Sequence, residues 1–132
     1  MTPDGVRGGL GTALKTIAGL RVFDYIPDSV SPPAGVVEFV EVRFDDAMHR
    51  GLDYYRGYVL IVLGRMDERA AQGRLDAYVA PSGAQSVKAA LEADPTLGGA
   101  CQTLRVTDAN PRTVVVSGIE MIAYRFGIDI YG

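Results

Sequence analysis

Residues that could do chemistry are few in this 132-residue chain, and they are scattered along it. His49 is the only histidine and Cys101 is the only cysteine. A zinc site would have to be built on carboxylates and Cys101, without a second histidine or paired thiols at useful spacing. A Ser-His-Asp triad would need His49 as its base, but His49 lies in a charged segment without a recognisable nucleophile turn. The sequence therefore predicts neither a metal centre nor a nucleophilic catalytic centre.

Segment 8–16 has the composition of a phosphate-binding loop but not its order. A P-loop has a glycine directly before its lysine so that backbone NH groups surround the phosphate, whereas Leu14 precedes Lys15 here. A dinucleotide-binding turn needs a preceding strand and a third glycine at fixed spacing, and both are missing. We therefore interpret the segment as part of a helix that each glycine weakens by up to ~1 kcal/mol relative to alanine.

Carboxylates gather in three places, each in a polar turn, a loop or a helix start. Two carboxylates act as general acid and base only where a pocket shifts the pKa of one of them. The pair at a helix start is explained by the helix dipole, which favours negative charge there. We expect no hydrolytic centre at any of these groups, which are Asp24 with Asp28, Asp45 and Asp46 with Asp53, and Asp67 with Glu68.

The best candidate for an interaction surface is the charged segment 45–53 with the tyrosines that follow it. Tyrosine is enriched at interfaces because its ring is apolar and its tip is polar. An equally weighted alternative is a solvated loop, followed by tyrosines that pack the sheet against helices; Tyr58 is expected to face the core. The residues predicted to form an assembly interface are Asp45, Asp46, Met48, His49, Arg50, Asp53, Tyr54 and Tyr55.

The composition describes one domain, spanning residues 1–132, with a sizeable core. Hydrophobic residues make up 48% of the chain. A domain of this length buries roughly 65–70% of the surface that its unfolded chain exposes. Stability therefore needs neither a disulfide nor a metal ion, and a single cysteine fits a reducing compartment.

Charge and hydropathy disfavour nucleic-acid and membrane binding. The net charge is −3 and the basic residues are scattered, whereas a nucleic-acid binder normally carries a basic stripe. The longest apolar run, 58–63, is far shorter than the ~20 residues that span a bilayer. The chain starts with polar residues in place of a basic segment and an apolar run, so we expect a soluble protein without a signal peptide.

Apolar periodicity and turn residues predict the element order α-β-β-β-α-α-β-β-β. Strand runs without intervening helices favour an α+β domain with a mainly antiparallel, mixed sheet and about three helices packed on one face. We expect Gly19 to end the first helix in a left-handed conformation, a capping box at 82–85 to begin the third, and a turn at 108–111 to separate two late strands. The predicted helices cover 4–18, 67–79 and 82–94, and the predicted strands cover 20–25, 36–44, 54–63, 101–106, 112–117 and 122–130.

Several segments occur in an order and spacing that go beyond a fold class. The most distinctive are 86–99, which reads SVKAALEADPTLGG, and 124–131, which reads YRFGIDIY. In this order and spacing the chain resembles the tail terminator proteins of long-tailed bacteriophages, also described as minor tail or tail completion proteins. The resemblance covers most of the chain and includes 10–14, 26–33, 58–62 and 67–78.

The resemblance implies a structural virion protein without catalytic residues or a cofactor. Such proteins form a ring, usually a hexamer, which caps the tail tube, ends its polymerisation and offers a surface to the head connector. The implied partners are copies of the chain itself, the tail tube protein and the connector or stopper protein, with the tape measure protein as a further candidate. DNA would pass through the lumen without specific binding, and segment 45–53 would face either the lumen or the tube. The expected location is the virion tail or neck, and the host cytoplasm during assembly.

Two other interpretations stay open on the sequence. The chain could be another neck protein, such as a head–tail stopper or adaptor, which binds the connector and not the tube end. It could also be a small ligand-binding or enzymatic α+β domain that uses the acidic loop and the tyrosines, which requires a closed pocket holding carboxylates.

Overall fold

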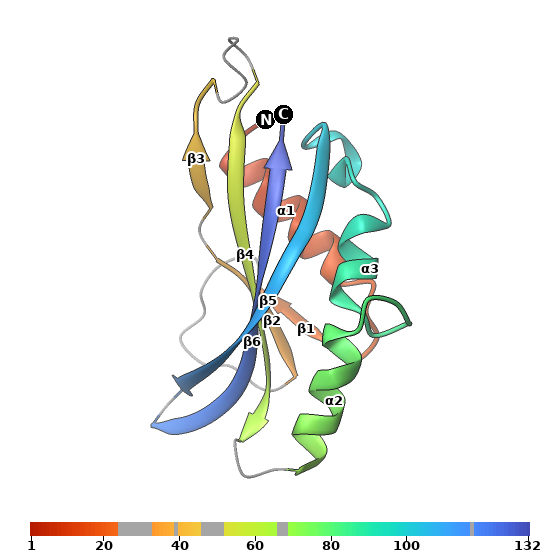
Figure 1. The fold of residues 1–132 in the computed structure, drawn as a ribbon, viewed down its shortest axis with the longest axis vertical. Coiled ribbons are helices and arrows are strands. Elements are labelled where there is room, and N and C mark those ends of the chain that lie inside the picture. The colour runs from red at the N-terminus through yellow and green to blue at the C-terminus, as the bar shows by residue number, and fades with distance from the viewer. Residues whose placement is uncertain (24–32, 39, 46–51, 66–68, 117) are drawn as a thin grey trace.

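The computed structural model describes residues 1–23, 33–38, 40–45, 52–65, 69–116 and 118–132, and Figure 1 shows its ribbon. Within these ranges the chain forms three α-helices, one 3-10 turn and a six-stranded sheet. The expected α+β class is confirmed. The elements are α1 (Pro3–Leu14), β1 (Arg21–Phe23), β2 (Ala34–Val37), β3 (Glu41–Arg43), β4 (Tyr54–Arg65), α2 (Arg69–Val79), α3 (Val87–Glu92), η1 (Leu97–Gly99), β5 (Thr103–Val116) and β6 (Ile119–Tyr131).

Strand β4 is the centre of the sheet. The strand order is β1-β2-β4-β6-β5, and β3 pairs with β4 off this path. β3 pairs with residues 54–56 and β2 with residues 59–62, on the side of β4 that β6 does not occupy. Every pair is antiparallel except β1 with β2, which is parallel. The sheet is therefore mixed and mainly antiparallel, and β5 forms one of its edges.

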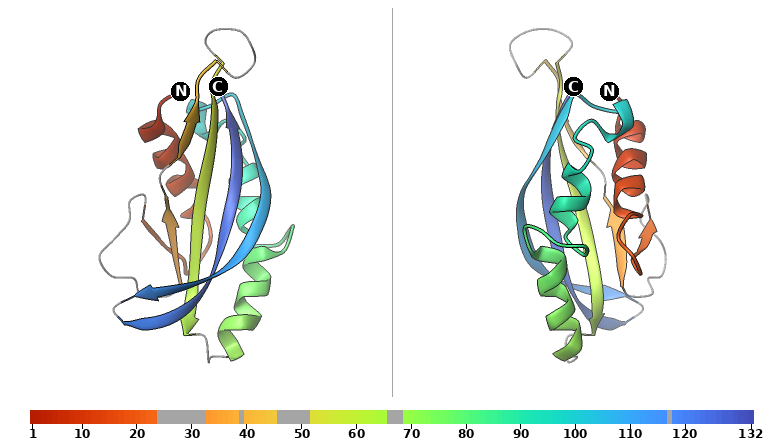
Figure 2. Two further views of the ribbon diagram at one scale, coloured as in Figure 1. Left: turned by 60° about the vertical axis from the view of Figure 1, so that its left-hand side comes forward. Right: turned by 90° about the vertical axis from the view of Figure 1, so that its right-hand side faces the viewer.

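The three helices lie on one face of the sheet, which we call the inner face (Figure 2). α1 buries Val6, Leu10 and Leu14 completely, and their spacing is that of one helical stripe. Alternate residues of β4 and β6 pack against them, because successive side chains of a strand point to opposite faces. These strand residues are Tyr55, Val59, Ile61, Leu63, Phe126, Ile128 and Ile130. The opposite side of the sheet is the outer face.

Helix α1 begins one residue earlier than predicted and ends earlier too. Thr2 is its cap, because its hydroxyl accepts a hydrogen bond from the backbone NH of Gly5 at 3.1 Å. The helix ends at Leu14, after which the chain continues in turns. Gly19 has the expected left-handed conformation, with a φ of +80°, but the expectation that it ends the helix is wrong, since it lies in the turns that follow.

Helix α3 begins at a different cap from the one predicted. The expected capping box over 82–85 is wrong, because the capping serine is Ser86. Its buried hydroxyl accepts a hydrogen bond from Ala89 N at 3.1 Å and donates one to Ala80 O at 2.6 Å. Ser86 thus joins the start of α3 to the end of α2, a contact that local sequence spacing does not reveal.

The single strand expected over 36–44 is wrong, since the chain forms two short strands, β2 and β3, along one side of β4. Glu38 interrupts the apolar alternation of this segment. Its carboxylate receives a hydrogen bond from Arg125 of β6 at 3.1 Å. The polar residue that interrupts the pattern therefore lies between the two strands.

Two separate late strands were expected with a turn at 108–111, and this is also wrong. β5 runs without a break from Thr103 to Val116 and contains Pro111. A proline is tolerated here because β5 is an edge strand, where a missing NH need not break a ladder. A register shift between Val106 and Asp108 accommodates the extra residue as a bulge.

Candidate functional site

Segment 45–53 is described only at its two ends. Asp45 has a φ of +52°, a left-handed conformation that aspartate tolerates, and its NH donates to Asp53 Oδ1 at 3.1 Å. Asp53 in turn exchanges two backbone hydrogen bonds with Gly132, at 2.9 and 3.1 Å. That the segment faces a lumen or a tube stays a prediction. The candidate residues that lie outside the described part of the chain are Asp46, Met48, His49 and Arg50.

The two adjacent candidate tyrosines lie on opposite faces of β4. Tyr55 is 2% exposed, and its hydroxyl donates to Met1 O at 3.3 Å. Burial, followed by the nearby charge of Asp53, raises the Tyr55 pKa. Tyr55 is thus a core residue, and its ring is not available to a partner in this conformation. Tyr58 was expected in the core but lies on the outer face with Tyr54, so that expectation is wrong.

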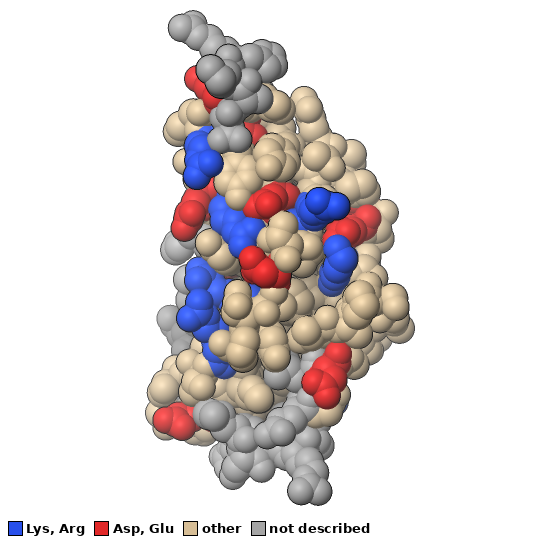
Figure 3. All heavy atoms as spheres, in the orientation of Figure 1, with Lys and Arg blue, Asp and Glu red and all other residues tan. Residues whose placement is uncertain are grey.

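Arg56 connects three strands on the outer face. Its Nη1 donates to Asp129 Oδ1 of β6 at 2.8 Å and to the Thr107 hydroxyl of β5 at 2.7 Å. Its Nη2 donates to Asp108 Oδ2 of β5 at 2.8 Å. A guanidinium can hold two carboxylates in this way because it is planar and has five NH donors. Figure 3 shows the resulting mixture of basic and acidic side chains across this face.

Gly127 makes this connection possible. It lies on β6 opposite Tyr58 on one side and Asp108 on the other, directly between the strands that Arg56 links. A Cβ atom at this position would come within 3.0 Å of both the Arg56 guanidinium and the Asp108 carboxylate, closer than side chains tolerate. The missing side chain therefore leaves the space through which Arg56 reaches β5.

Tyr54 donates to the same carboxylate oxygen, Asp129 Oδ1, at 2.5 Å. Burial, then this hydrogen bond and the charge of Asp129, raise the pKa of Tyr54 to about 12. Burial alone would lower the pKa of Arg56, but its hydrogen bonds with Asp108, Asp129 and Tyr58 raise it above the ordinary guanidinium value. Both donors therefore keep their protons at neutral pH.

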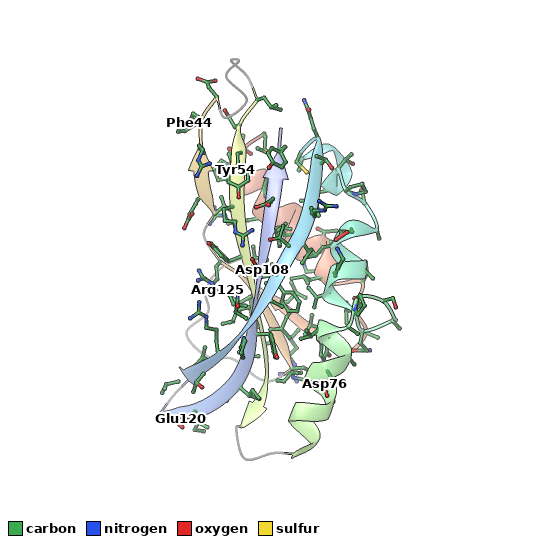
Figure 4. The ribbon with its side chains drawn as sticks, viewed as in Figure 1. Phe44, Tyr54, Asp76, Asp108, Glu120 and Arg125 are labelled. Carbon is green, nitrogen blue, oxygen red and sulfur yellow. The ribbon has the colours of Figure 1, made fainter. Side chains whose placement is uncertain are left out.

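Tyrosine rings and guanidinium groups stack beside the cluster formed by Tyr54, Arg56, Asp108 and Asp129. The guanidinium of Arg125 lies 3.8 Å from the centre of the Tyr58 ring, and that of Arg56 lies 5.5 Å from it. The ring centres of Tyr54 and Tyr131 are 5.3 Å apart. The guanidinium of Arg43 lies over the Tyr54 ring, 5.3 Å from its centre. Figure 4 shows Tyr54 on β4, Asp108 on β5 and Arg125 on β6. Tyrosine and arginine are the residue types that contribute most to protein interfaces.

In the cluster of Tyr54, Arg56, Asp108 and Asp129, both carboxylates are already engaged by donors. Both Asp108 and Asp129 accept hydrogen bonds from Arg56, and Tyr54 holds its proton against Asp129. A general base needs a carboxylate free to take a proton from a substrate. Among the described residues no group of three or more histidine, cysteine or carboxylate side chains could hold a metal ion.

Three hollows in the described surface differ in size and lining. One of about 450 Å³ lies between α1 and α3 and is lined by small and apolar residues such as Gly9, Ala13 and Ala90. A second of about 450 Å³ lies beside β5 and includes Lys88. A third, of about 190 Å³, is lined by Glu41, Val42, Arg43 and Tyr54. The third is smaller than the ~300 Å³ at which ligand pockets begin.

Exposed apolar side chains lie at two ends of the sheet. Phe44 is 73% exposed just after β3, and Figure 4 shows it at that end. Val115 and Ile119 are 66% and 37% exposed near the turn that joins β5 to β6. Exposed apolar side chains on a sheet are a frequent mark of contact surfaces, although single ones are common.

Sequence reasoning missed the residues that organise the outer face. Arg56 lies inside an apolar strand, and Asp129 alternates with isoleucines near the end of the chain. An arginine at such a position indicates a hydrogen-bond or ion-pair partner elsewhere in the chain, because a charge within an apolar strand needs one. Its partners could not be named, since they depend on the register of β4, β5 and β6.

No helix among the described residues combines the length and the apolar character that crossing a membrane would need. No family model matches this chain. No curated protein matches it either.

Proposed function

We propose that this chain is a structural subunit that joins six copies of itself into a ring on the end of a phage tail tube. The ring ends polymerisation of the tube protein and gives the head connector its attachment surface. The order and spacing of segments such as 86–99 and 124–131 motivate this proposal. A stopper or adaptor role in the same neck remains the nearest alternative.

The observation that carries the proposal is the difference between the two edges of the sheet. A closed ring needs a heterologous interface, in which one patch of a subunit meets a different patch of the next. The 14-residue β5 forms one edge, and among the described strands β1 and β3 form the other side. The chain thus offers two unlike strand edges on opposite sides of one sheet, which is what head-to-tail contact requires.

The outer face supports the proposal because its side chains are already held in place. Arg56 fixes β4, β6 and β5 to one another, and Tyr54 and Tyr58 are held by hydrogen bonding and stacking. A surface ordered before binding loses less conformational entropy when a partner docks. Such a surface suits the docking of a partner subunit.

The available surface is large enough for a ring. A stable contact buries at least ~1,200 Å² in total, shared between two partners. Two such contacts would cover about a sixth of the 7186 Å² of accessible surface on each subunit. The rest remains for the tube and the connector. The net charge of −3 suits a lumen for DNA, since carboxylates repel phosphates.

Polymerisation of a tail tube protein in the presence of this chain tests the proposal. Electron microscopy should show shorter tubes, each with a ring on one end, and tube length should fall as the ratio of chain to tube protein rises. Adding the chain after polymerisation is complete should cap the tubes without shortening them. Unchanged tubes, with the chain monomeric at every concentration, would contradict the proposal. Binding to connector protein alone would favour the stopper or adaptor role.

A further inference from the structure

One row of charged side chains crosses the outer face from edge to edge, and we call it the charge row. It consists of Arg105 on β5, Asp129 on β6, Arg56 on β4 and Glu41 on β3, each directly opposite the next in the sheet register. Residues directly opposite one another share a face of the sheet. The row therefore alternates basic, acidic, basic and acidic across four strands.

The two ends of the charge row differ from its middle. Arg56 and Asp129 form a direct ion pair at 2.8 Å. Arg105 and Glu41 are both exposed, and no ion pair holds either of them within the part of the chain that the structure describes. The sheet thus presents an unpaired positive charge at its β5 edge and an unpaired negative charge at its β3 edge, at the same level.

From this complementarity we infer that a second copy of the chain places its β3 edge beside β5, so that its Glu41 pairs with Arg105. The inference rests on the proposed self-assembly and specifies its contact. The charge alternation then continues from one copy to the next without a like-charged neighbour. Strand direction agrees, since β3, β4, β6 and β5 alternate in direction and a further β3 would again lie antiparallel to β5.

The same charges disfavour one alternative register. A shift of two residues along β3 keeps the side chains on the same face but sets Arg43 opposite Arg105, and like charges directly opposite each other are destabilising. The hollow lined by Glu41, Val42, Arg43 and Tyr54 lies at this edge and leaves room beside Glu41 for an incoming guanidinium.

Side chains, and not a continuous backbone ladder, make the contact at this level. Glu92 accepts a hydrogen bond from Val106 N, and Lys88 donates one to Val106 O, both at 3.4 Å, so α3 already occupies the backbone of β5 next to Arg105. A long arginine can still extend past this edge on the outer face. A contact carried by exposed charges should weaken as salt concentration rises.

Charge reversal tests the pairing. Sedimentation of the full chain, up to its highest soluble concentration, measures the dissociation constant of self-association. Arg105→Glu and Glu41→Arg should each raise the dissociation constant at least ~10-fold, because like charges then face each other. The variant carrying both reversals should associate more tightly than either single reversal, because the pair is restored in the opposite sense, while each reversed side chain faces a like charge on its own neighbouring strand. Arg74→Glu and Asp76→Arg on the exposed face of α2 carry the same charge changes and should have little effect.

The outcomes separate this inference from the proposed function. If the wild type assembles and the reversals do not weaken it, or the combined variant does not recover, the pairing is wrong and the ring proposal stands. If the wild type stays monomeric at every concentration and with tube protein present, both fall. Circular dichroism of each variant shows that a loss of association is not a loss of folding.

Discussion

Strand β4 presents its two faces to different surroundings, and the faces are stabilised in different ways. On the inner face Tyr55 and Val59 are buried among apolar side chains, where area removed from water provides the stability. On the outer face Arg56 is held by directional bonds to two neighbouring strands. The inner face depends on volume, whereas the outer face depends on the register of three strands. Substitutions that remove buried volume should therefore act on the inner face, and substitutions that disturb contacts between strands should act on the outer face.

The largest effect is expected on the inner face. Phe126 is 2% exposed and is among the largest buried side chains of the described residues. Phe126→Ala should lower the free energy of unfolding by about 3–5 kcal/mol, through lost burial and the cavity that remains. Urea unfolding followed by circular dichroism measures this loss. Val115→Ala, at a 66% exposed position, is the control and should change stability by less than about 0.5 kcal/mol. Equal losses at both positions would mean that the core is assigned wrongly.

The next largest effect is expected from adding one methyl group to the outer face. Gly127→Ala removes no buried volume but forces Arg56 away from Asp108, which should cost about 2 kcal/mol of unfolding free energy. Gly127 does not have a positive φ, so alanine introduces no backbone strain there. The effect would come from displacement of the Arg56 guanidinium and of the Asp108 carboxylate that it binds.

A double-mutant cycle with Arg56→Ala isolates that cause. Once the guanidinium is absent, Gly127→Ala should cost at least about 1 kcal/mol less than it does in the wild type, because contacting residues couple by this order. Additive losses would show that the glycine serves some other purpose than giving Arg56 its path.

The two faces also differ in how far they could be predicted. Local alternation predicted the inner residues of β6, such as Phe126 and Ile128, because a period of two depends on neighbours in sequence. The contacts of Arg56 could not be predicted, since Asp108 and Asp129 are more than 50 positions away in the chain and meet it only through the sheet register. The α+β class was predictable for the same reason, because the periodicity of helices and strands also depends on neighbours in sequence.

Two of the errors have different physical sources. Pro111 indicates a turn in isolation, but at the edge of a sheet its missing NH need not break a ladder, and β5 continues through it. Here tertiary position overrode local preference. Tyr58 in an apolar run favours the core by composition, but the alternation of side chains along β4 places it with Arg56 on the outer face. Of the candidate interaction residues, Tyr54 is placed on the outer face and Tyr55 in the core.

A smaller effect should follow from removing the stacked ring. Tyr58→Leu keeps an apolar side chain but removes the ring that Arg125 contacts at 3.8 Å, and should cost about 1 kcal/mol. Tyr58→Phe keeps the ring and should cost less. Thermal or urea unfolding measures the loss of stability in each of these two variants. A loss from phenylalanine equal to that from leucine would assign the stability to the hydroxyl and its bond with Arg56, and not to stacking.

The smallest effect concerns pH and sharpens the role of Tyr54. Its pKa in the folded protein is about 12, against an ordinary 10.0, because it is partly buried and donates to Asp129. Between these values the unfolded chain loses the phenolic proton first, so the folded state binds more protons and stability falls as pH rises from about 10 towards 12. The contribution is fully present below pH 10.0 and lost above the folded pKa. Urea unfolding across this range should show a shallower fall for Tyr54→Phe than for the wild type, and absorbance titration should show one late-ionising phenol fewer. An unchanged slope would mean that Asp129 is held by Arg56 alone, and the outer face would then depend on a single donor.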